Sequence, residues 1–205
     1  MGRMRGTWER PHGLAYIPDL ITVPEEERLL CRLAEDSYGE VRMHGQVARR
    51  TVRHYGVSYH FETAEISPGD PIPEWLVGLR RRCAELLGSP DERLAECLLT
   101  RYPPGATIGW HRDAPMFGDV VGVSLGSACL LRFQRGQGDQ RRVFEQALDP
   151  RSGYVLRGPS RSAWQHSIPA VTEERYSITF RTLRRRSLPA AERGRRPKRG
   201  PQAPA

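Results

Sequence analysis

Cysteines and long apolar runs are scarce in this sequence, and each shortage excludes a class of protein. The 205 residues include four cysteines, at positions 31, 83, 97 and 129, whose wide spacing suits neither a zinc ribbon nor a disulfide scaffold. We expect reduced cysteines that behave as small buried residues. No apolar run approaches the roughly 20 residues that a membrane helix needs, and residues 1–13 lack the apolar core of a secretory signal. A cytoplasmic protein without a membrane partner, monomeric in solution, is the expectation.

Positive charge dominates the composition, but it is unevenly distributed. The net charge is +8, and residues 184–205 hold eight basic residues against one acid, which leaves only +1 for residues 1–183. This C-terminal segment is rich in arginine, proline and glycine and has no apolar period, so we expect it to be disordered. It is either a sequence-independent tether for the phosphate backbone of nucleic acid or simply a solvated tail.

The order of the apolar patterns predicts a mostly β protein with flanking helices, an α+β fold. Residues 24–37 and 71–88 have apolar residues at helical spacing, with prolines near both starts and Gly88 as a stop signal. Alternating aromatics in 49–62 indicate strand and loop. From residue 94 onward, short β-type runs alternate with turns and show no βαβ pattern. We therefore expect an antiparallel sandwich or barrel with the helices packed outside it.

Two histidines and an aspartate in the β-rich part are candidate metal ligands. His111 and Asp113 are two residues apart, so an extended chain directs both side chains to one face. His166 follows a turn-like segment, and an antiparallel sheet can return it to the same end as His111 and Asp113. Two imidazoles and one carboxylate form the facial triad of non-haem Fe(II) oxygenases, which leaves positions open for a co-substrate and O2. The alternative is an ordinary hydrogen-bonded surface pair.

The segment RYSITFRTL, residues 175–183, alternates between a polar face and an apolar face. One face carries Arg175, Ser177, Thr179 and Arg181, and the other carries Tyr176, Ile178 and Phe180. Buried arginines need anionic partners, and no clear acidic strand is visible in residues 1–183. A small dicarboxylate such as 2-oxoglutarate would satisfy both arginines. The alternative is an edge strand that two arginines flank.

Four separated motifs in one order give the sequence a family resemblance. They are TRYPPGATIGWHRD, VVGVSLGS, GYVLRGPSRSAWQHSI and RYSITFR, and over residues 49–183 they resemble the AlkB family of Fe(II)/2-oxoglutarate dioxygenases. The resemblance implies a double-stranded β-helix (jelly-roll) core over 94–183. It also implies N-terminal helices and a nucleotide-recognition lid within 1–93, and a tail over 184–205.

The resemblance also implies roles for individual residues. Iron is held by His111, Asp113 and His166, which form the catalytic centre. The residues implied for 2-oxoglutarate are Thr100, Tyr102, Arg175, Ser177 and Arg181. The residues implied for the substrate are Arg50, Tyr55, Tyr59 and Phe61. For the aromatics the alternative is core packing of a strand.

Three positions depart from the family pattern. Thr100 and Ser177 stand where asparagines are common, although both can still hydrogen-bond a carboxylate. Pro115 stands where bacterial members place an acidic residue that contacts the base, which leaves the choice of base open.

The expected activity is therefore oxidative demethylation of N-alkylated bases in DNA or RNA, with release of formaldehyde. The target base would be flipped out or taken from a single strand. An oxygenase acting on a tRNA modification or a protein side chain is the alternative, and a non-catalytic nucleic-acid-binding jelly roll is a third candidate.

Overall fold

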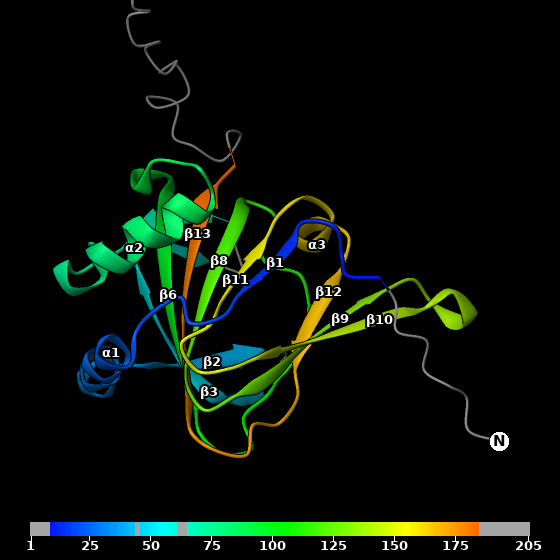
Figure 1. The fold of residues 1–205 in the computed structure, drawn as a ribbon, viewed down its shortest axis with the longest axis horizontal. Coiled ribbons are helices and arrows are strands. Elements are labelled where there is room, and N and C mark those ends of the chain that lie inside the picture. The colour runs from blue at the N-terminus through cyan, green and yellow to red at the C-terminus, as the bar shows by residue number, and fades with distance from the viewer. Residues whose placement is uncertain (1–8, 44–45, 61–64, 185–205) are drawn as a thin grey trace, which may run out of the picture.

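The computed structural model describes residues 9–43, 46–60 and 65–184. Two longer helices flank a mostly β body (Figure 1). The helices are α1 (Val23–Glu35), α2 (Glu74–Leu86) and the short α3 (Gly158–Ser162), with 3-10 turns η1 (Asp91–Arg93) and η2 (Gly138–Gln140). The strands are β1 (Leu14–Ile17), β2 (Gly39–Met43), β3 (Gln46–Tyr55), β4 (Val57–His60), β5 (Glu65–Pro68), β6 (Leu94–Tyr102), β7 (Ile108–His111), β8 (Phe117–Gly126), β9 (Cys129–Arg135), β10 (Arg142–Leu148), β11 (Gly153–Leu156), β12 (Gln165–Ile168) and β13 (Arg175–Leu183).

Both predicted helices are present, and their ends follow from local chemistry. Thr22 caps α1 through the backbone N–H of Glu25, whose carboxylate accepts from the backbone N–H of Thr22 in return, which completes a capping box. Helix α2 begins at Glu74, three residues later than the start of the predicted range, because Pro73 has an extended backbone and serves as its N-cap. Beyond its C-terminal end, Gly88 takes a positive φ of 57°, which glycine tolerates best.

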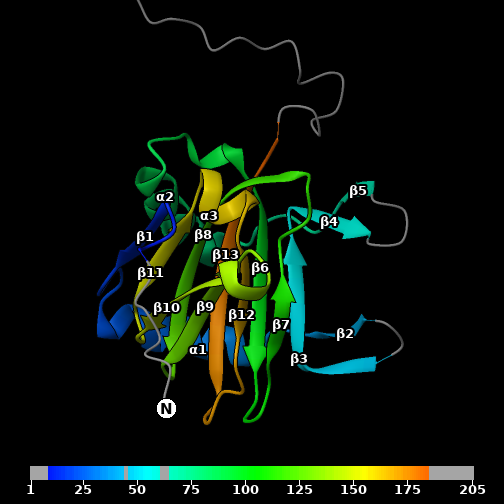
Figure 2. The ribbon, with the colours of Figure 1, turned by 90° about the vertical axis from the view of Figure 1, so that its right-hand side faces the viewer.

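Two antiparallel sheets face each other and form the body (Figure 2). The seven-stranded sheet has the order β1-β11-β8-β13-β6-β3-β2, the four-stranded sheet the order β10-β9-β12-β7, and β4 and β5 pair separately. This arrangement confirms the predicted mostly β fold with flanking helices. Strands β1, β2 and β3, from the segment predicted as helices and lid, extend the large sheet on both of its edges.

The large sheet separates two hydrophobic cores. On its outer face, leucines of α1 and α2 pack against Tyr176, Ile178 and Phe180 of β13. On its inner face, residues such as Tyr102 and Leu156 meet Leu131 and Phe133 of the small sheet. The predicted alternation of β13 is therefore correct, and its polar face looks into the space between the two sheets.

The cysteines only partly match the expectation of burial. Cys83 and Cys97 are buried, Cys129 is half-buried and Cys31 is exposed on α1, and all four are free thiols. Cys31 is exposed because it lies on the solvent side of an amphipathic helix whose inner face is formed by Leu29 and Leu33. None of the helices among the described residues combines the length and the hydrophobicity that a membrane span needs.

Candidate iron and 2-oxoglutarate site

The three predicted metal ligands converge at one end of the small sheet. His111 is the last residue of β7 and pairs in register with His166 of β12, and their ring centroids are 4.3 Å apart. Asp113 follows β7 by two residues. One ligand atom from each of the three residues lies within 4.8 Å of the others, close enough to share one ion. The pairing of β7 with β12 therefore brings together the ligands whose proximity the sequence spacing could only suggest.

Local contacts hold these side chains in the state that a metal requires. The Nδ1–H of His111 donates to the carbonyl of Gly109 at 2.9 Å, which leaves Nε2 as the unprotonated nitrogen. Burial lowers the pKa of His111 and lowers that of His166 to about 3, so both imidazoles are neutral at pH 7. Burial alone would raise the pKa of Asp113, but Arg181 and then His166 attract the carboxylate and hold its pKa well below the usual range.

Two arginines flank the carboxylate of Asp113. Arg181 donates to its Oδ1 from Nε at 3.1 Å and from a terminal nitrogen at 2.9 Å. Arg161 places its Nε 3.7 Å from Oδ2, and its terminal nitrogen donates to the carbonyls of Ala114 and Phe117. The expectation that residues 1–183 have no clear acidic strand to pair with the arginines is wrong for Arg181, because Glu96 of β6 pairs with it, as does Asp113.

Arg175, in contrast, is a buried cation that no carboxylate of the described residues contacts. Its side chain is fully buried, Nε donates to Ser124 Oγ at 3.2 Å, and its guanidinium lies 4.8 Å from the centre of the Tyr102 ring. One terminal nitrogen has no hydrogen-bond partner among the described residues. A buried guanidinium with an unused donor fits the distal carboxylate of 2-oxoglutarate.

A row of hydroxyls lies beside Arg175 on the inner face of the large sheet. Ser177 of β13 pairs in register with Thr100 of β6 on one side and with Ser124 of β8 on the other. All three are buried. Thr100 and Ser177 were predicted as co-substrate residues, whereas Ser124 was missed. Its signal was a serine within the otherwise apolar run VVGVSLG.

The residues predicted to bind the substrate have different surroundings. Arg50 of β3 is half-buried, and electrostatic coupling to Tyr102, Arg181 and His111 places it near the site. Tyr55 does not face the site: it packs in the helix-side core, and its hydroxyl donates to Asp36 at 2.6 Å. For Tyr55 the core-packing alternative is correct, because alternation along β3 turns it away from the side of Arg50.

The two remaining aromatics cannot be assigned in the same way. Tyr59 lies on β4, and only its backbone is described. Phe61 lies outside the described residues.

Glu96 and Arg161 are site residues that the sequence analysis did not identify. Glu96 lies on β6 with 1% of its surface exposed and accepts a hydrogen bond from Arg181. Arg161 lies in α3, within a segment interpreted as a plain turn, and is 3% exposed. For Glu96 the only available signal was a single charge within the apolar run of β6, and for Arg161 there was none.

The donor set fits the group that the triad predicts. Two neutral imidazoles and one ionised carboxylate suit iron(II). Asp113 Oδ2 is buried without a hydrogen-bond partner among the described residues, as expected for an oxygen that faces a metal ion. The unused donor of Arg175 adds the matching half-site for a dicarboxylate.

Comparison with known proteins agrees with this geometry. The model of the family described as 2OG-Fe(II) oxygenase superfamily matches residues 13–181. The chain is 29% identical over 168 residues to the mouse tRNA (carboxymethyluridine(34)-5-O)-methyltransferase ALKBH8, a match that covers 77% of the chain and 24% of that protein. It is 29% identical over 154 residues to the alpha-ketoglutarate-dependent dioxygenase AlkB of Escherichia coli K12, covering 66% of the chain and 70% of AlkB. The chain thus spans about a quarter of the length of the vertebrate ALKBH8 proteins that it matches.

Solved structures show the same fold. The structure of OsALKBH1 superimposes with a TM-score of 0.63 at 15% identity, covering 86% of this chain and 99% of that one. An oxidoreductase of the 2OG-Fe(II) oxygenase family from Burkholderia pseudomallei gives a TM-score of 0.55 at 19% identity, covering 83% of this chain and 85% of that one. Because the family model matches most of the chain, this chain belongs to the 2OG-Fe(II) oxygenase superfamily.

Proposed function

We propose that this protein oxidatively demethylates N-alkylated bases in nucleic acid. The observation that carries the proposal is the placement of the triad and Arg175 on the inner side of two sheets, with strand β3 paired to β6 and Arg50 near the site. His111, Asp113 and His166 would hold iron(II), which when bound would supply oxidation by dioxygen coupled to decarboxylation of 2-oxoglutarate to succinate and carbon dioxide. Hydroxylation of an N-methyl group gives an N-hydroxymethyl group, which breaks down to formaldehyde and the unmodified base.

The residues of this chain have separate tasks in that reaction. Arg175 and Ser124 bind and orient the distal carboxylate of the co-substrate, beside the hydroxyls of Thr100 and Ser177. The buried side chains of Phe133, Tyr102 and Leu131 exclude water from the space between the sheets. Arg50 contributes positive charge near the mouth, where a nucleotide phosphate can meet it.

The direct test measures formaldehyde and succinate together. Purified protein with Fe(II) and 2-oxoglutarate is offered matched oligonucleotides that carry one N-methylated adenine or cytosine, as single-stranded DNA, duplex DNA and RNA. The expected result is stoichiometric formaldehyde and succinate with at least one methylated oligonucleotide and none with its unmethylated control. Succinate without formaldehyde from every oligonucleotide would contradict the proposal.

A hydroxylase of a tRNA modification is the second candidate. The observation that favours it is that the match to ALKBH8 covers 77% of this chain, more than the 66% covered by the match to AlkB. Hydroxylation at a carbon of a modified uridine would leave a stable product and no formaldehyde. The same assay therefore separates the two candidates when modified tRNA is added to the panel and the nucleosides are analysed by mass.

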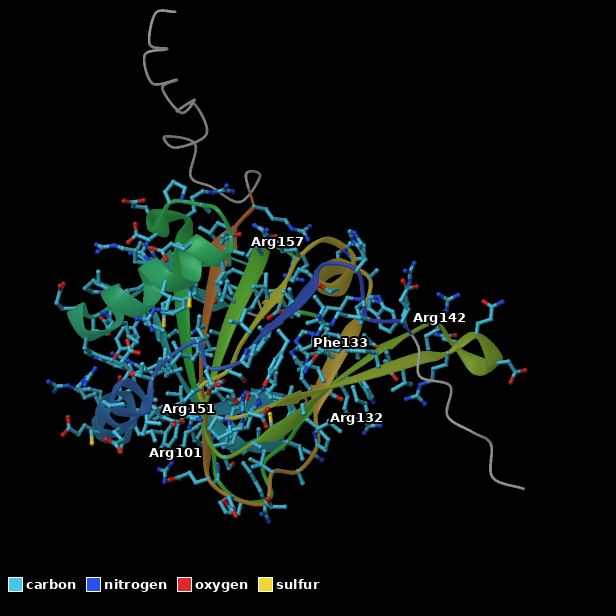
Figure 3. The ribbon with its side chains drawn as sticks, in the orientation of Figure 1. Arg101, Arg132, Phe133, Arg142, Arg151 and Arg157 are labelled. Carbon is cyan, nitrogen blue, oxygen red and sulfur yellow. The ribbon has the colours of Figure 1, made fainter. Side chains whose placement is uncertain are left out.

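A cationic hairpin supports nucleic acid as the partner. Strands β9 and β10 form a hairpin that projects from the body (Figures 1 and 3), with Arg132 and Arg142 on it. Arg135, Arg141 and Arg142 are exposed, and Arg135 and Arg142 line a surface hollow. Asp139 at the tip offsets part of this charge. We propose that the hairpin contacts phosphates, as the sequence predicts for the basic tail, whose residues 185–205 lie outside the described part.

The hairpin has its own test. Replacing Arg135 and Arg142 together by alanine should weaken oligonucleotide binding and make the slope of log affinity against log salt shallower, by about one for each phosphate that the hairpin no longer neutralises. The matched control replaces Arg28 and Arg32, exposed on α1, which removes the same charge. An equal loss in both double variants would show a non-specific charge effect.

A further inference from the structure

We propose that Glu96 is a positioning residue for the iron site: it holds Arg181 against one oxygen of Asp113, so that the other oxygen faces the metal. The proposal rests on the iron and 2-oxoglutarate chemistry of the family and is independent of which substrate is oxidised.

Glu96 is a buried carboxylate that is used on both of its oxygens. Its Oε2 accepts a 2.6 Å hydrogen bond from a terminal nitrogen of Arg181, and its Oε1 is 3.0 Å from Nδ1 of His54. Because a carboxylate can only accept, the histidine donates in the second contact. Glu96 and Arg181 are directly paired across β6 and β13, so their relative position is fixed by the backbone register rather than by flexible loops.

Arg181 uses the rest of its planar fork on Asp113. Its Nε and its second terminal nitrogen both donate to Oδ1, at 3.1 and 2.9 Å. Oδ2 has no hydrogen-bond partner among the described residues, and it lies 3.8 Å from Nε2 of His166. The Nε of Arg161 is 3.7 Å from Oδ2, too far for a hydrogen bond. Oδ1 is therefore bonded to Arg181, and Oδ2 remains for the ion.

Charge gives Glu96 a second effect. Arg181 and Arg161 both lie beside Asp113, so without Glu96 these three side chains would carry one net positive charge, which repels a divalent cation. Glu96 cancels that positive charge at hydrogen-bond distance from Arg181. In this buried environment the field of the Glu96 carboxylate is poorly screened, so it favours metal binding.

The two arginines of β13 have different partners and therefore different roles. All three guanidinium nitrogens of Arg181 are engaged by carboxylates of the protein, whereas Arg175 has an unused donor. The distal carboxylate of the co-substrate therefore goes to Arg175. Glu96 also accepts a hydrogen bond from His54 of β3, the strand that carries Arg50. Strand β3 is therefore linked to Asp113 through Glu96 and Arg181.

The test is a calorimetric titration of Mn(II) into the metal-free full-length protein without 2-oxoglutarate. Glu96→Gln keeps the shape of the side chain and removes its charge, and we expect Mn(II) binding about 10- to 100-fold weaker, as for other partners of metal ligands. Glu25→Gln is the matched control: Glu25 also pairs with an arginine, Arg82, but on the helices. It should leave Mn(II) affinity unchanged.

A second measurement separates positioning from co-substrate binding. At saturating Mn(II), the affinity of Glu96→Gln for 2-oxoglutarate should equal that of the wild type. Unchanged Mn(II) affinity in the folded variant overturns the proposal, and so does a loss of 2-oxoglutarate affinity with metal affinity intact.

Arg181→Lys provides the remaining arm, because it keeps the charge but loses the fork. It should also weaken Mn(II) binding, and its effect should not add to that of Glu96→Gln, since both break the same contact. If Glu96→Gln does not fold, Arg181→Lys alone decides: wild-type Mn(II) affinity in that variant overturns the proposal. No arm uses nucleic acid, so the outcome is distinct from that of the demethylation assay.

Discussion

Replacing Arg175 by methionine should weaken 2-oxoglutarate binding strongly without destabilising the metal-free protein. Arg175 is fully buried, and its contacts are the hydroxyl of Ser124 and the face of Tyr102. No carboxylate of the described residues pairs with it, so a charge is held in the protein interior for a partner that arrives from outside. Methionine is of similar length and removes that charge.

The expected loss of 2-oxoglutarate affinity follows from the hydrogen-bonded charge pair that the co-substrate can no longer form with Arg175. Removing one partner of a buried, hydrogen-bonded charge pair costs about 2–5 kcal/mol, which corresponds to a dissociation constant raised roughly 30- to 4,000-fold. Arg175→Lys keeps a point charge but not the planar fork, so its loss should be intermediate. Without co-substrate, replacing an unpaired buried cation by an apolar side chain should leave the free energy of unfolding unchanged or raise it.

Two assays check these statements on the same samples. Titration of 2-oxoglutarate at saturating Mn(II) gives the dissociation constant, and urea denaturation of the metal-free protein gives the stability. Arg82→Met is the control, because Arg82 pairs with Glu25 between the two helices: it should lower stability and leave 2-oxoglutarate affinity intact. Wild-type 2-oxoglutarate affinity in folded Arg175→Met would refute the reasoning and place the co-substrate elsewhere.

Three further predictions concern the metal ligands and the fold. His111→Ala should abolish Mn(II) binding and succinate formation, because it removes one of three ligands; unchanged turnover would contradict the triad. The pKa of His166 is about 3 when folded, so between about pH 6.5 and 3 only the unfolded chain binds this proton, and the metal-free protein should lose stability as the pH falls through that window. His166→Gln should reduce that dependence in urea titrations, and an identical dependence would argue against the shift. Thr22→Ala removes the cap of α1 and should lower the free energy of unfolding by about 1 kcal/mol, checked by the same titration with Thr51→Ala on β3 as a comparison.

Apolar periodicity predicted the class of fold, and the order of the motifs predicted the iron ligands, because both properties can be read from local sequence patterns. Apolar spacing indicated the two helices, and alternation indicated which face of β13 is polar. The separation of His111 from His166 carried no geometric information by itself. Only the pairing of β7 with β12 brings the two rings together.

The surroundings of the ligands could not be predicted, because they depend on contacts between strands distant in sequence. Glu96 meets Arg181 because β6 and β13 are neighbours in a particular register. Arg161 reaches Asp113 because α3 packs beside the end of β8. A similar reason explains the error on Tyr55, since alternation predicts two faces of β3 but not which face the helices cover.

The sequence by itself therefore determined which side chains can hold iron(II), that two arginines of one strand can take a dicarboxylate, and that these residues lie on a β framework. Those properties depend on residue type and local period. The tertiary structure decided which of the two arginines of β13 is engaged by protein carboxylates and which has an unused donor. That division depends on burial and on the partners that cross-strand register supplies, and neither is encoded in local spacing.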